Sequence, residues 1–395
     1  MEGMFALSDE QLVAIARAFA DKVTEGLARD GQEIRCLPTW CATELPAEPQ
    51  PALVLDVGGT NLRAARMTRK ADGWHVEQGP VEARLPVVRG RPLPREQFLG
   101  TQADLLARVA RGTGGAMPLG YCFSYPAESL PGGDARLIHW TKEVFVPDTE
   151  GECVGQPLLD ELRRRSVPCS SVTVVNDTVA SLLAGAPACG GEGLIGLIVG
   201  TGTNMAALLP ARSIPKLGHP TGRAAPIPVN LESGNFHPDF LNECDETVDQ
   251  ASEHPGRQRF EKAVSGAYLG RLLKAACPEA PIDPEVGSQA VVGLATGSDA
   301  APPSVSSAAR AILLRSARLV AASIAGLASR LPTPAGRCRI VAEGSLFWKA
   351  PGYADAVRTT LGTILKGIGQ RGIECSIVRV ADANLAGAAL GAQPR

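Results

Sequence analysis

The run Asp-Val-Gly-Gly-Thr-Asn at residues 56–61 is the strongest chemical pattern in the sequence. It ends an apolar run, residues 52–57, that has the composition of a buried strand. The two glycines let backbone N–H groups approach phosphate oxygens closely, and Thr60 and Asn61 add side-chain donors. Asp56, near the end of the strand, can hold a water molecule of a magnesium ion. The pattern therefore indicates a phosphate-binding turn.

Other kinds of glycine-rich turn are distinguished by the residues that come after the glycines. No Gly-Lys-Ser/Thr is present there, so the run is not a Walker loop. A strand at residues 62–67, and not a helix, comes next, so the run is not a dinucleotide fingerprint. A type I′ hairpin turn is the plain structural alternative. The buried Asp56 before the glycines, and Thr60 and Asn61 after them, favour phosphate binding.

Asn176 and Asp177 stand where an apolar strand, residues 172–175, meets a small-residue helix, residues 179–184. Asn or Asp at this place is the usual N-terminal cap of a helix, which is the plain structural interpretation. Open α/β sheets, however, bind ligands beyond the carboxyl ends of their strands. A carboxylate here could accept the proton of a hydroxyl group as its oxygen attacks phosphorus. Taken alone, the pair leaves both interpretations open.

Further positions carry suitable groups without a pattern of their own. Thr141 and Lys142 follow Trp140 in a loop, and Glu232 and Glu261 could accept hydrogen bonds from sugar hydroxyls. Isolated lysine and glutamate side chains are usually solvated at the surface. These residues therefore gain meaning only in combination.

One segment is echoed later in the chain. Residues 54–61 resemble residues 197–204, because each segment reads as a strand, a Gly/Thr turn and the start of a second strand. Gly-Thr turns are common, so chance could produce the likeness. The physical alternative is a duplicated domain, in which each copy offers a backbone-rich turn to one ligand in the cleft between them.

The elements that must position these residues follow from the apolar pattern. An amphipathic helix is expected over residues 8–29, with Ser8 and Gln11 at capping-box spacing. Residues 278–307 are rich in Pro and Ser and read as loop, except around 290–294. The other expected strands are residues 194–199, 205–209 and 339–342, and the other expected helices are residues 258–274, 308–330 and 354–366.

Composition narrows the class of protein. A chain of 395 residues with 45% hydrophobic and 20% charged residues is expected to form two globular domains. A net charge of −2 argues against a nucleic-acid partner. No apolar run is expected to span a membrane and no signal sequence is seen, so a cytoplasmic protein is expected. The ten cysteines form no C-x-x-C pair and are expected to be reduced thiols, and a zinc site has little support.

Together the motifs resemble the hexokinase family. They occur in that family's order over nearly the whole chain, which makes the resemblance specific. The segments that carry it are residues 7–29 with 37–39, 56–61, 123–126, 140–142, 175–179, 198–204, 230–232 and 242–270, including Glu-His-Pro-Gly at 253–256 and Phe-Glu-Lys-Ala-Val-Ser-Gly at 260–266.

The resemblance implies a role for each matching residue. Asp177 corresponds to the general base that deprotonates the sugar 6-hydroxyl, and Lys142 to a residue that also stabilises the transferring phosphoryl group. The implied sugar contacts are Ser124, Thr141, Lys142, Asn176, Asp177, Asn204, Glu232 and Glu261. The implied contacts to ATP with its Mg²⁺ are Asp56 (through water to the metal), Gly58, Gly59, Thr60, Asn61, Thr201, Gly202, Gly344 and Ser345.

Some positions depart from the family pattern. Glu343 stands where the family usually has Asp before Gly344 and Ser345. Residues 233–236 read Ser-Gly-Asn-Phe where Trp-Gly-Ala-Phe is expected, and residues 383–389 lack the expected Gly-Ser-Gly-Lys. These departures concern the adenine side and the rim of the sugar site, and leave the base and the phosphate turns in place.

The resemblance also implies a fold and a reaction. The expected fold is α/β, the two-domain actin-like (ribonuclease H-like) ATPase fold with an interdomain cleft. The small domain is expected at residues 52–175 plus 383–395, and the large domain at 1–51 plus 176–382. The expected reaction is ATP-dependent phosphorylation of a hexose, with glucose favoured, by a monomer or homodimer. The alternatives are a sugar sensor without turnover and a kinase for another sugar, such as an amino sugar.

Overall fold

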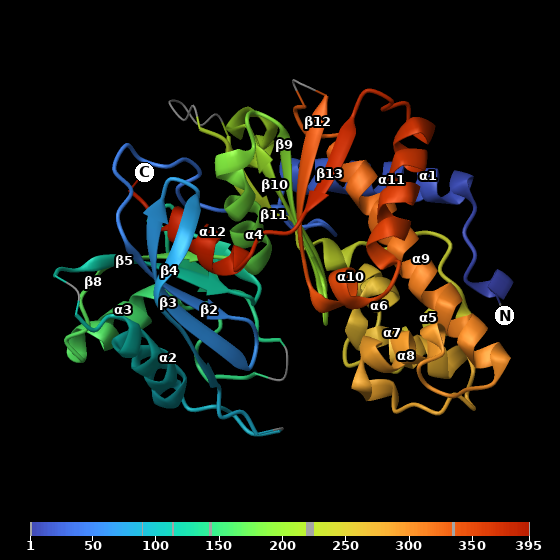
Figure 1. The fold of residues 1–395 in the computed structure, drawn as a ribbon, viewed down its shortest axis with the longest axis horizontal. Coiled ribbons are helices and arrows are strands. Elements are labelled where there is room, and N and C mark those ends of the chain that lie inside the picture. Colours follow the sequence, from blue (N-terminus) through green and yellow to red (C-terminus); the bar gives the residue numbers. More distant parts are fainter. Residues whose placement is uncertain are drawn as a thin grey trace.

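The computed structural model describes residues 2–88, 90–112, 114–141, 144–218, 225–333 and 336–394. In this part of the chain, apolar strands assemble into two large sheets, each with its own cluster of buried apolar side chains. Figure 1 shows the two sheets on opposite sides of the molecule, with helices packed around each. A short third sheet pairs β6 (Ala127–Ser129) with β7 (Ala135–Leu137).

The first sheet carries the turn at residues 58–60. Its strands stand in the order β4-β3-β2-β5-β8. The pairs β4-β3 and β3-β2 are antiparallel, whereas β2-β5 and β5-β8 are parallel. Helices α2 (Arg95–Val109) and α3 (Gly155–Arg164) contribute apolar side chains to its core. The strands are β2 (Ala52–Val57), β3 (Asn61–Lys70), β4 (Gly73–Arg84), β5 (Met117–Phe123) and β8 (Cys169–Val175).

The second sheet repeats this plan. Its order is β1-β11-β10-β9-β12-β13, with β11-β10 and β10-β9 antiparallel and β9-β12 and β12-β13 parallel. Apart from the added β1, this is the same series of pairings as in the first sheet, so of the two interpretations that the sequence left open, the topology favours the duplicated domain. The strands are β1 (Leu37–Pro38), β9 (Gly193–Val199), β10 (Thr203–Leu209), β11 (Ile227–Asn230), β12 (Arg337–Glu343) and β13 (Glu374–Val378).

The helices on the side of the second sheet bury most of their apolar faces in one shared core. They are α1 (Asp9–Ala28), α5 (Glu243–Gln250), α6 (Arg259–Val264), α7 (Gly266–Ala276), α8 (Ser288–Thr296), α9 (Pro303–Ala328), α10 (Ser345–Lys349) and α11 (Tyr353–Gly367). Short 3₁₀ turns lie at Glu2–Met4, Ala186–Ala188, Ala211–Ser213, Pro215–Leu217, Ser233–Asn235 and Pro284–Val286.

Two helices join the sheets. Helix α4 (Asp177–Gly185) contacts β9, β10 and β12, and α12 (Ala383–Gly391) contacts β2 and β5. They lie side by side between the sheets (Figure 1). A Cβ atom added to Gly387 on α12 would lie 1.7 Å from the carbonyl oxygen of Ala180 on α4. The close approach of α12 to α4 therefore needs glycine at position 387. It places α12 against the helix that begins at Asp177.

We expect Gly387→Ala to destabilise the protein by roughly 1–3 kcal/mol, because the added methyl group overpacks the contact between α4 and α12. The urea midpoint of unfolding measures this. Gly362→Ala is the matched control, since Gly362 also lies in a helix, α11, but a Cβ there has no atom within 4 Å. Alanine favours helix over glycine, so the control should be neutral or stabilising. Equal midpoints for the two variants would contradict the expectation.

Several expected elements are found with changed bounds. The helix expected over 8–29 is α1, and Ser8 and Gln11 form the expected capping box. The single helix expected over 258–274 is wrong, because the chain breaks at Ser265, whose backbone is extended. The break lets Gly266 N donate to the carbonyl of Gly200, 2.8 Å away, which fastens this region to the turn after β9.

The loop expected over 278–307 is shorter than predicted. Helix α8 occupies Ser288–Thr296, and α9 already begins at Pro303 instead of at residue 308. Proline is acceptable in the first turn of a helix, where its missing N–H has no partner to lose. The Pro and Ser content therefore concealed the start of the long helix.

Helix α9 is long and apolar enough to cross a membrane, contrary to the sequence expectation. However, 78% of its most apolar window is buried inside the protein, where it packs against α1, α8 and α11. This is the environment of a core helix. All ten cysteines lie in the described part of the chain and are free thiols, as expected.

Candidate functional site

The first glycine-rich turn joins β2 to β3. Gly58 N donates to the carbonyl of Asn61 (3.1 Å), and Gly59 has a φ of 108°, which favours glycine. The hydroxyl of Tyr125 donates to the carbonyl of Gly59 (3.0 Å) from a fully buried position. The turn is thus a hairpin, which was the plain structural alternative. Its hydrogen bonds hold it in place, which is also compatible with phosphate binding.

Asp56 lies at the base of this turn and is 7% exposed. Its Oδ2 accepts hydrogen bonds from Arg63 (3.2 Å) and Asn384 (3.4 Å), whereas its Oδ1 is buried with no hydrogen-bond partner among the described residues. Burial raises the pKa of Asp56, the charge of Arg63 opposes this, and the charge of Asp177 adds to it. A buried carboxylate oxygen without a hydrogen-bond partner can bind a hard cation directly or accept a hydrogen bond from a water molecule bound to the cation.

The second glycine-rich turn joins β9 to β10. Gly200 N donates to the carbonyl of Gly202 (2.9 Å), and Thr201 accepts a hydrogen bond from Ala267 N (3.1 Å). Gly344, before α10, has a φ of 111°, and a Cβ there would lie 2.1 Å from the carbonyl oxygen of Val199. The parallel strands β9 and β12 end together, so Gly344 and the adjacent Ser345 lie against this turn, and their contact to ATP stays a prediction.

The head of α4 carries Asn176 and Asp177. Asn176 is the N-cap, and its Oδ1 accepts from Thr178 N (3.0 Å). Asp177 is the first helical residue; its Oδ1 also accepts from Thr178 N (2.9 Å). The capping interpretation is therefore correct for Asn176. Since Asn176 already caps the helix, capping does not account for the carboxylate of Asp177.

Hydrogen bonds link Asn176 to Glu232 through three further side chains. Thr178 Oγ1 donates to Asn176 Oδ1 (2.5 Å), and Asn204 Nδ2 lies 3.4 Å from Thr178 Oγ1. Asn204 also donates to Asn230 Oδ1 (2.8 Å), which in turn donates through Nδ2 to Glu232 Oε1 (2.8 Å). This series, called here the asparagine network, fixes amide and carboxylate groups contributed by α4, β10 and β11.

Glu261, on α6, is fastened to the second turn. Its Oε2 accepts from Thr203 N (3.0 Å), and its Oε1 accepts from Gln258 Nε2 (3.2 Å). A Cβ added to Gly202 would lie 2.7 Å from Oε2, so the turn and the carboxylate are in close contact. Glu261 thus lies beside the turn that leads into Asn204.

The remaining predicted residues belong to the side of the first sheet. Ser124 follows β5, is 6% exposed, and its N–H donates to the carbonyl of Val57 (3.1 Å). Thr141 accepts a hydrogen bond at its carbonyl from Val144 N (3.2 Å). Lys142 lies outside the described residues, so its predicted role is not placed by the structure.

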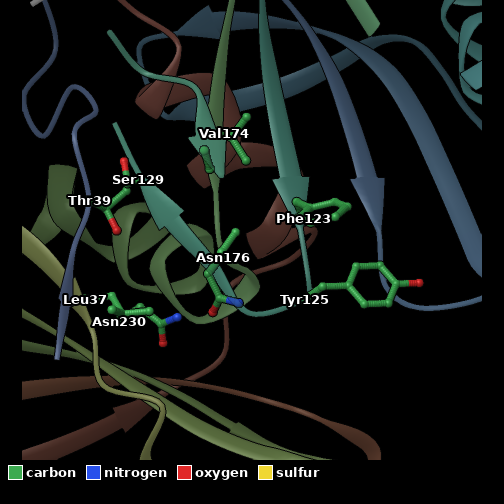
Figure 2. A pocket seen from close by; sticks show the side chains of 10 residues that line it. Leu37, Thr39, Phe123, Tyr125, Ser129, Val174, Asn176 and Asn230 are labelled. Atoms are coloured by element: carbon green, nitrogen blue, oxygen red, sulfur yellow. The ribbon is translucent and has the colours of Figure 1, made fainter. Parts of the chain in front are cut away.

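A narrow crevice lies behind Asn176 and Asn230, between β1, β6 and the ends of β5 and β8. Figure 2 shows Asn176 in the middle of the lining residues, with Asn230, Thr39 and Ser129 on one side of it and Phe123 and Tyr125 on the other. It encloses ≈ 20 Å³, which is room for about one water molecule. A hexose does not fit there, so the crevice backs the asparagine network and is not itself the sugar site.

Several residues that the sequence did not single out contact the site. Arg63 bridges Asp56 and Asp382 (both 3.2 Å), and Arg84 Nε donates to Asn61 Oδ1 (3.0 Å). Asn61 and Arg84 are paired across β3 and β4. The alternation of a strand places Arg63 on the same face as Asn61, which is a signal the sequence did contain. The other such residues are Thr178, Asn230, Gln258 and Asn384.

The buried Asp56 and the half-buried Glu343 make the donor side sensitive to pH. Burial raises the pKa of both Asp56 and Glu343. Their folded-state pKa values exceed the unfolded ones, so they add stability at low pH that is lost as pH rises through the folded pKa. When the pH falls through the same pKa values, the two carboxylates are protonated and lose the negative charge with which they could bind a cation.

Because the family resemblance implies that this turn binds Mg-ATP, we expect kcat/KM for Mg-ATP to fall on acidification, starting above the pH range in which an exposed aspartate, with a pKa of 3.8, titrates. The measurement varies the Mg-ATP concentration at each pH while the phosphoryl acceptor is kept saturating. In Asp56→Asn, the part of the decrease in kcat/KM that comes from protonation of Asp56 should disappear. A profile for Asp56→Asn identical in shape to that of the wild type would contradict the assignment.

Comparison with known proteins bears on this arrangement. Family models described as hexokinase match residues 1–187, and residues 194–281 with 286–393. Hexokinase-1 of Saccharomyces cerevisiae is 32% identical over 293 residues, which are 69% of this chain and 59% of the relative. The match to that curated relative thus covers less than two thirds of its length.

Solved structures agree in fold. A hexokinase from Schistosoma mansoni complexed with glucose matches with a TM-score of 0.83 and 24% identity, over 99% of this chain and 97% of that one. A ROK family glucokinase from Streptomyces griseus in complex with glucose and AMPPNP matches with a TM-score of 0.52 and 18% identity, over 86% of this chain and 98% of that one. These likenesses confirm the actin-like ATPase fold. With hexokinase models matching nearly its whole length, this chain belongs to the hexokinase family.

Proposed function

We propose that this protein transfers the γ-phosphoryl group of ATP to the 6-hydroxyl of a hexose, with glucose as the preferred substrate and fructose and mannose as further ones. The observation that carries the proposal is the head of α4. There Asn176 supplies the N-cap through its hydrogen bond from Thr178 N, so the carboxylate of Asp177, at the first helical position, is not needed to cap the helix. Matched relatives named as hexokinases, and matched structures with glucose and with AMPPNP, support the same reaction.

The proposed sugar site uses groups that suit hydroxyls. Glu232 and Glu261 offer acceptors, and Asn176 and Asn204 offer amides that are held by the asparagine network. Ser124, Thr141 and Lys142 would contact the sugar from the side of the first sheet. A pyranose presents hydroxyls around its whole rim, so contacts from both sides satisfy more of them than one side could.

The proposed chemistry is one in-line displacement. Asp177 accepts the proton of the sugar hydroxyl while that oxygen forms a bond to the γ-phosphorus, and the bond from phosphorus to the β-phosphate oxygen breaks to release ADP. Lys142 would stabilise charge on the transferring group. The phosphate contacts would come from the two turns, namely Gly58, Gly59, Thr60, Asn61, Thr201 and Gly202, with Gly344 and Ser345 on the nucleotide side.

The site also suits a magnesium ion that accompanies ATP. The observation that favours a magnesium site is the Oδ1 of Asp56, which has no hydrogen-bond partner within the described part of the chain. Glu343 is a second carboxylate, and the charge of Asp56 acts on it. A bound Mg²⁺ would neutralise phosphate charge. In this proposal Asp56 holds the ion through a water molecule, and Arg63 compensates the rest of its charge.

We further propose two domains, residues 52–175 plus 383–395 and residues 1–51 plus 176–382, that close on the sugar. Closure would expel water and bring Lys142 to the phosphates, which limits wasteful hydrolysis of ATP. A cytoplasmic location, and a monomer or homodimer without nucleic-acid or membrane partners, fit this proposal.

A coupled assay of ADP release against a panel of sugars tests the proposed function. The panel contains glucose, fructose, mannose, glucosamine and N-acetylmannosamine, each with Mg-ATP. Sugar-dependent ADP release with the highest kcat/KM for glucose is expected. A preference for an amino sugar would instead identify a kinase for that sugar. Sugar binding without ADP release would identify a sensor.

Glu232 and Glu261 are expected to accept hydrogen bonds from different hydroxyls of one pyranose. Monodeoxyglucoses that lack one of these hydroxyls should bind more weakly by roughly 1–3 kcal/mol per lost contact, because the carboxylate loses a hydrogen bond that the sugar would donate. In Glu232→Ala and Glu261→Ala the penalty for the matching deoxy sugar should vanish. If both variants bind glucose as tightly as the wild type, neither residue lines the site.

A further inference from the structure

Asp249 is the most deeply buried carboxylate in the described part of helix α5, at 1% exposed. Its Oδ1 accepts a hydrogen bond from Lys262 Nζ (2.7 Å). Its Oδ2 pairs with Arg259 (2.8 Å) and accepts from the backbone N–H of Gly256 (2.8 Å). One carboxylate therefore joins two buried cations and a backbone amide.

These contacts fasten the loop that leads from α5 to α6. Gly256 lies within that loop, and Arg259 and Lys262 lie in the first turn of α6. Lys262 Nζ also donates to the carbonyl of His254 (2.8 Å), so the ammonium group bridges the loop to Asp249. The loop and the start of α6 are thus held at a single charged centre.

The same segment carries two groups of the sugar site. Glu261 lies between Arg259 and Lys262 in sequence, and Gln258, which donates to Glu261, precedes α6. Gln258 has a φ of 53°, a left-handed conformation that is unfavourable for a residue other than glycine. Such a conformation persists only where the surroundings impose it. The contacts of Asp249 on both sides of Gln258 supply that constraint.

We infer that Asp249 is a positioning residue for sugar recognition, which holds Gln258 and Glu261 in the geometry that accepts sugar hydroxyls without itself touching the sugar. This rests on the proposed function, because it takes Glu261 as a sugar contact. The role depends on charge most directly at Lys262, which an amide could not balance, whereas Arg259 also pairs with Glu246.

The electrostatics of Asp249 agree with this role. Burial acts to raise the pKa of Asp249, but the hydrogen bonds from Lys262, Gly256 and Arg259 outweigh it, and the pKa lies below its ordinary value. The carboxylate is therefore ionised at neutral pH. Asp249→Asn keeps the size of the side chain and removes this charge, so it isolates the feature on which the inference depends.

The test measures glucose binding by titration calorimetry and steady-state kinetics for Asp249→Asn. We expect the Kd and KM for glucose to rise roughly tenfold, the size of coupling found between neighbouring residues, with kcat changed less than about threefold. Asp249→Asn and Glu261→Gln should be non-additive in glucose affinity. The penalty for the deoxyglucose whose missing hydroxyl faces Glu261 should shrink in Asp249→Asn, a change that lost stability alone would not produce.

Asp245→Asn is the matched control. Asp245 lies one turn earlier on α5, is 5% exposed, and pairs with Arg315 on α9 through two hydrogen bonds of 2.6 and 2.7 Å. It loses the same charge in the same helix but does not hold α6. Its glucose Kd should equal that of the wild type, even if its melting temperature falls.

The outcomes separate the inference from the proposed function. Wild-type protein that neither binds nor phosphorylates glucose would end both. Wild-type glucose affinity in folded Asp249→Asn, or an equal loss in Asp245→Asn, would overturn the inference alone. If Asp249→Asn does not fold, Lys262→Met replaces it, since that change removes the bridge to His254. Folded Lys262→Met with wild-type glucose affinity would then overturn the inference.

Discussion

Asp177→Asn will lower kcat for sugar phosphorylation by roughly a hundred- to ten-thousandfold, the contribution of a general base, while glucose still binds. The amide keeps the shape of the side chain and cannot accept the hydroxyl proton. Helix α4 should remain intact, because Asn176 supplies the N-cap through its hydrogen bond from Thr178 N. Stopped-flow turnover together with calorimetric glucose binding separates the two effects.

A control with the same chemical change makes this result specific. Asp355 also lies in the first turn of a helix, α11, and its side chain is 80% exposed. Asp355→Asn should leave kcat within about twofold of the wild type, as is usual for exposed positions away from a site. Turnover of Asp177→Asn within about a factor of ten of the wild type would rule out Asp177 as the base.

Asp56→Ala should reduce kcat/KM for Mg-ATP by roughly ten- to hundredfold. This is the usual cost of removing a residue that orients the ligands of a metal ion without binding the ion directly. The change removes the buried carboxylate beneath the first turn and leaves Arg63 with Asp382 alone. Glucose affinity should change little, because the asparagine network is contributed by other strands. Titration of Mg²⁺ at fixed ATP shows whether the metal requirement has weakened.

Asp382→Ala is the control for this variant. Asp382 also pairs with Arg63, at 3.2 Å, but its side chain is 44% exposed. An exposed ion pair contributes little, so we expect a much smaller change in the Mg²⁺ dependence. Identical Mg²⁺ titrations for Asp56→Ala and the wild type would show that Asp56 does not serve the metal.

The sequence predicted those parts of the site that local patterns encode. Residues 56–61 and 200–204 combine apolar strands with glycines, and both turns are present as expected. The head of α4 was also recognisable, although the sequence could not decide between capping and catalysis. The structure assigns the cap to Asn176, and the catalytic role of Asp177 stays a proposal.

Parts of the site that depend on distant contacts were not predictable in this way. The pairing of Asn204 with Asn230 requires β10 and β11 to be neighbours, and the break between α6 and α7 is tied to a hydrogen bond to Gly200. Asp249 lies within the segment 242–270 that carries the family resemblance, but the sequence assigned it no role. Its role depends on two cations that are brought to it only when α5 and α6 pack together.

One departure from the family pattern has a structural explanation. Asn384 stands in the segment where the expected Gly-Ser-Gly-Lys is missing. In the structure its Nδ2 reaches Asp56 Oδ2 (3.4 Å) and its Oδ1 accepts from Ser181 (3.1 Å). The substituted residue thus ties α12 to both α4 and the first turn.

Phosphorylation of a hexose at its 6-hydroxyl at the expense of ATP is the activity on which every other proposal for this chain depends. It is tested by incubating the protein with glucose and Mg-ATP and analysing the products by ³¹P and proton NMR. We expect one sugar phosphate for each ADP released, with the phosphorus coupled to the two protons on C6. No glucose-dependent ADP release, or a phosphate coupled to any other sugar position, would contradict this activity.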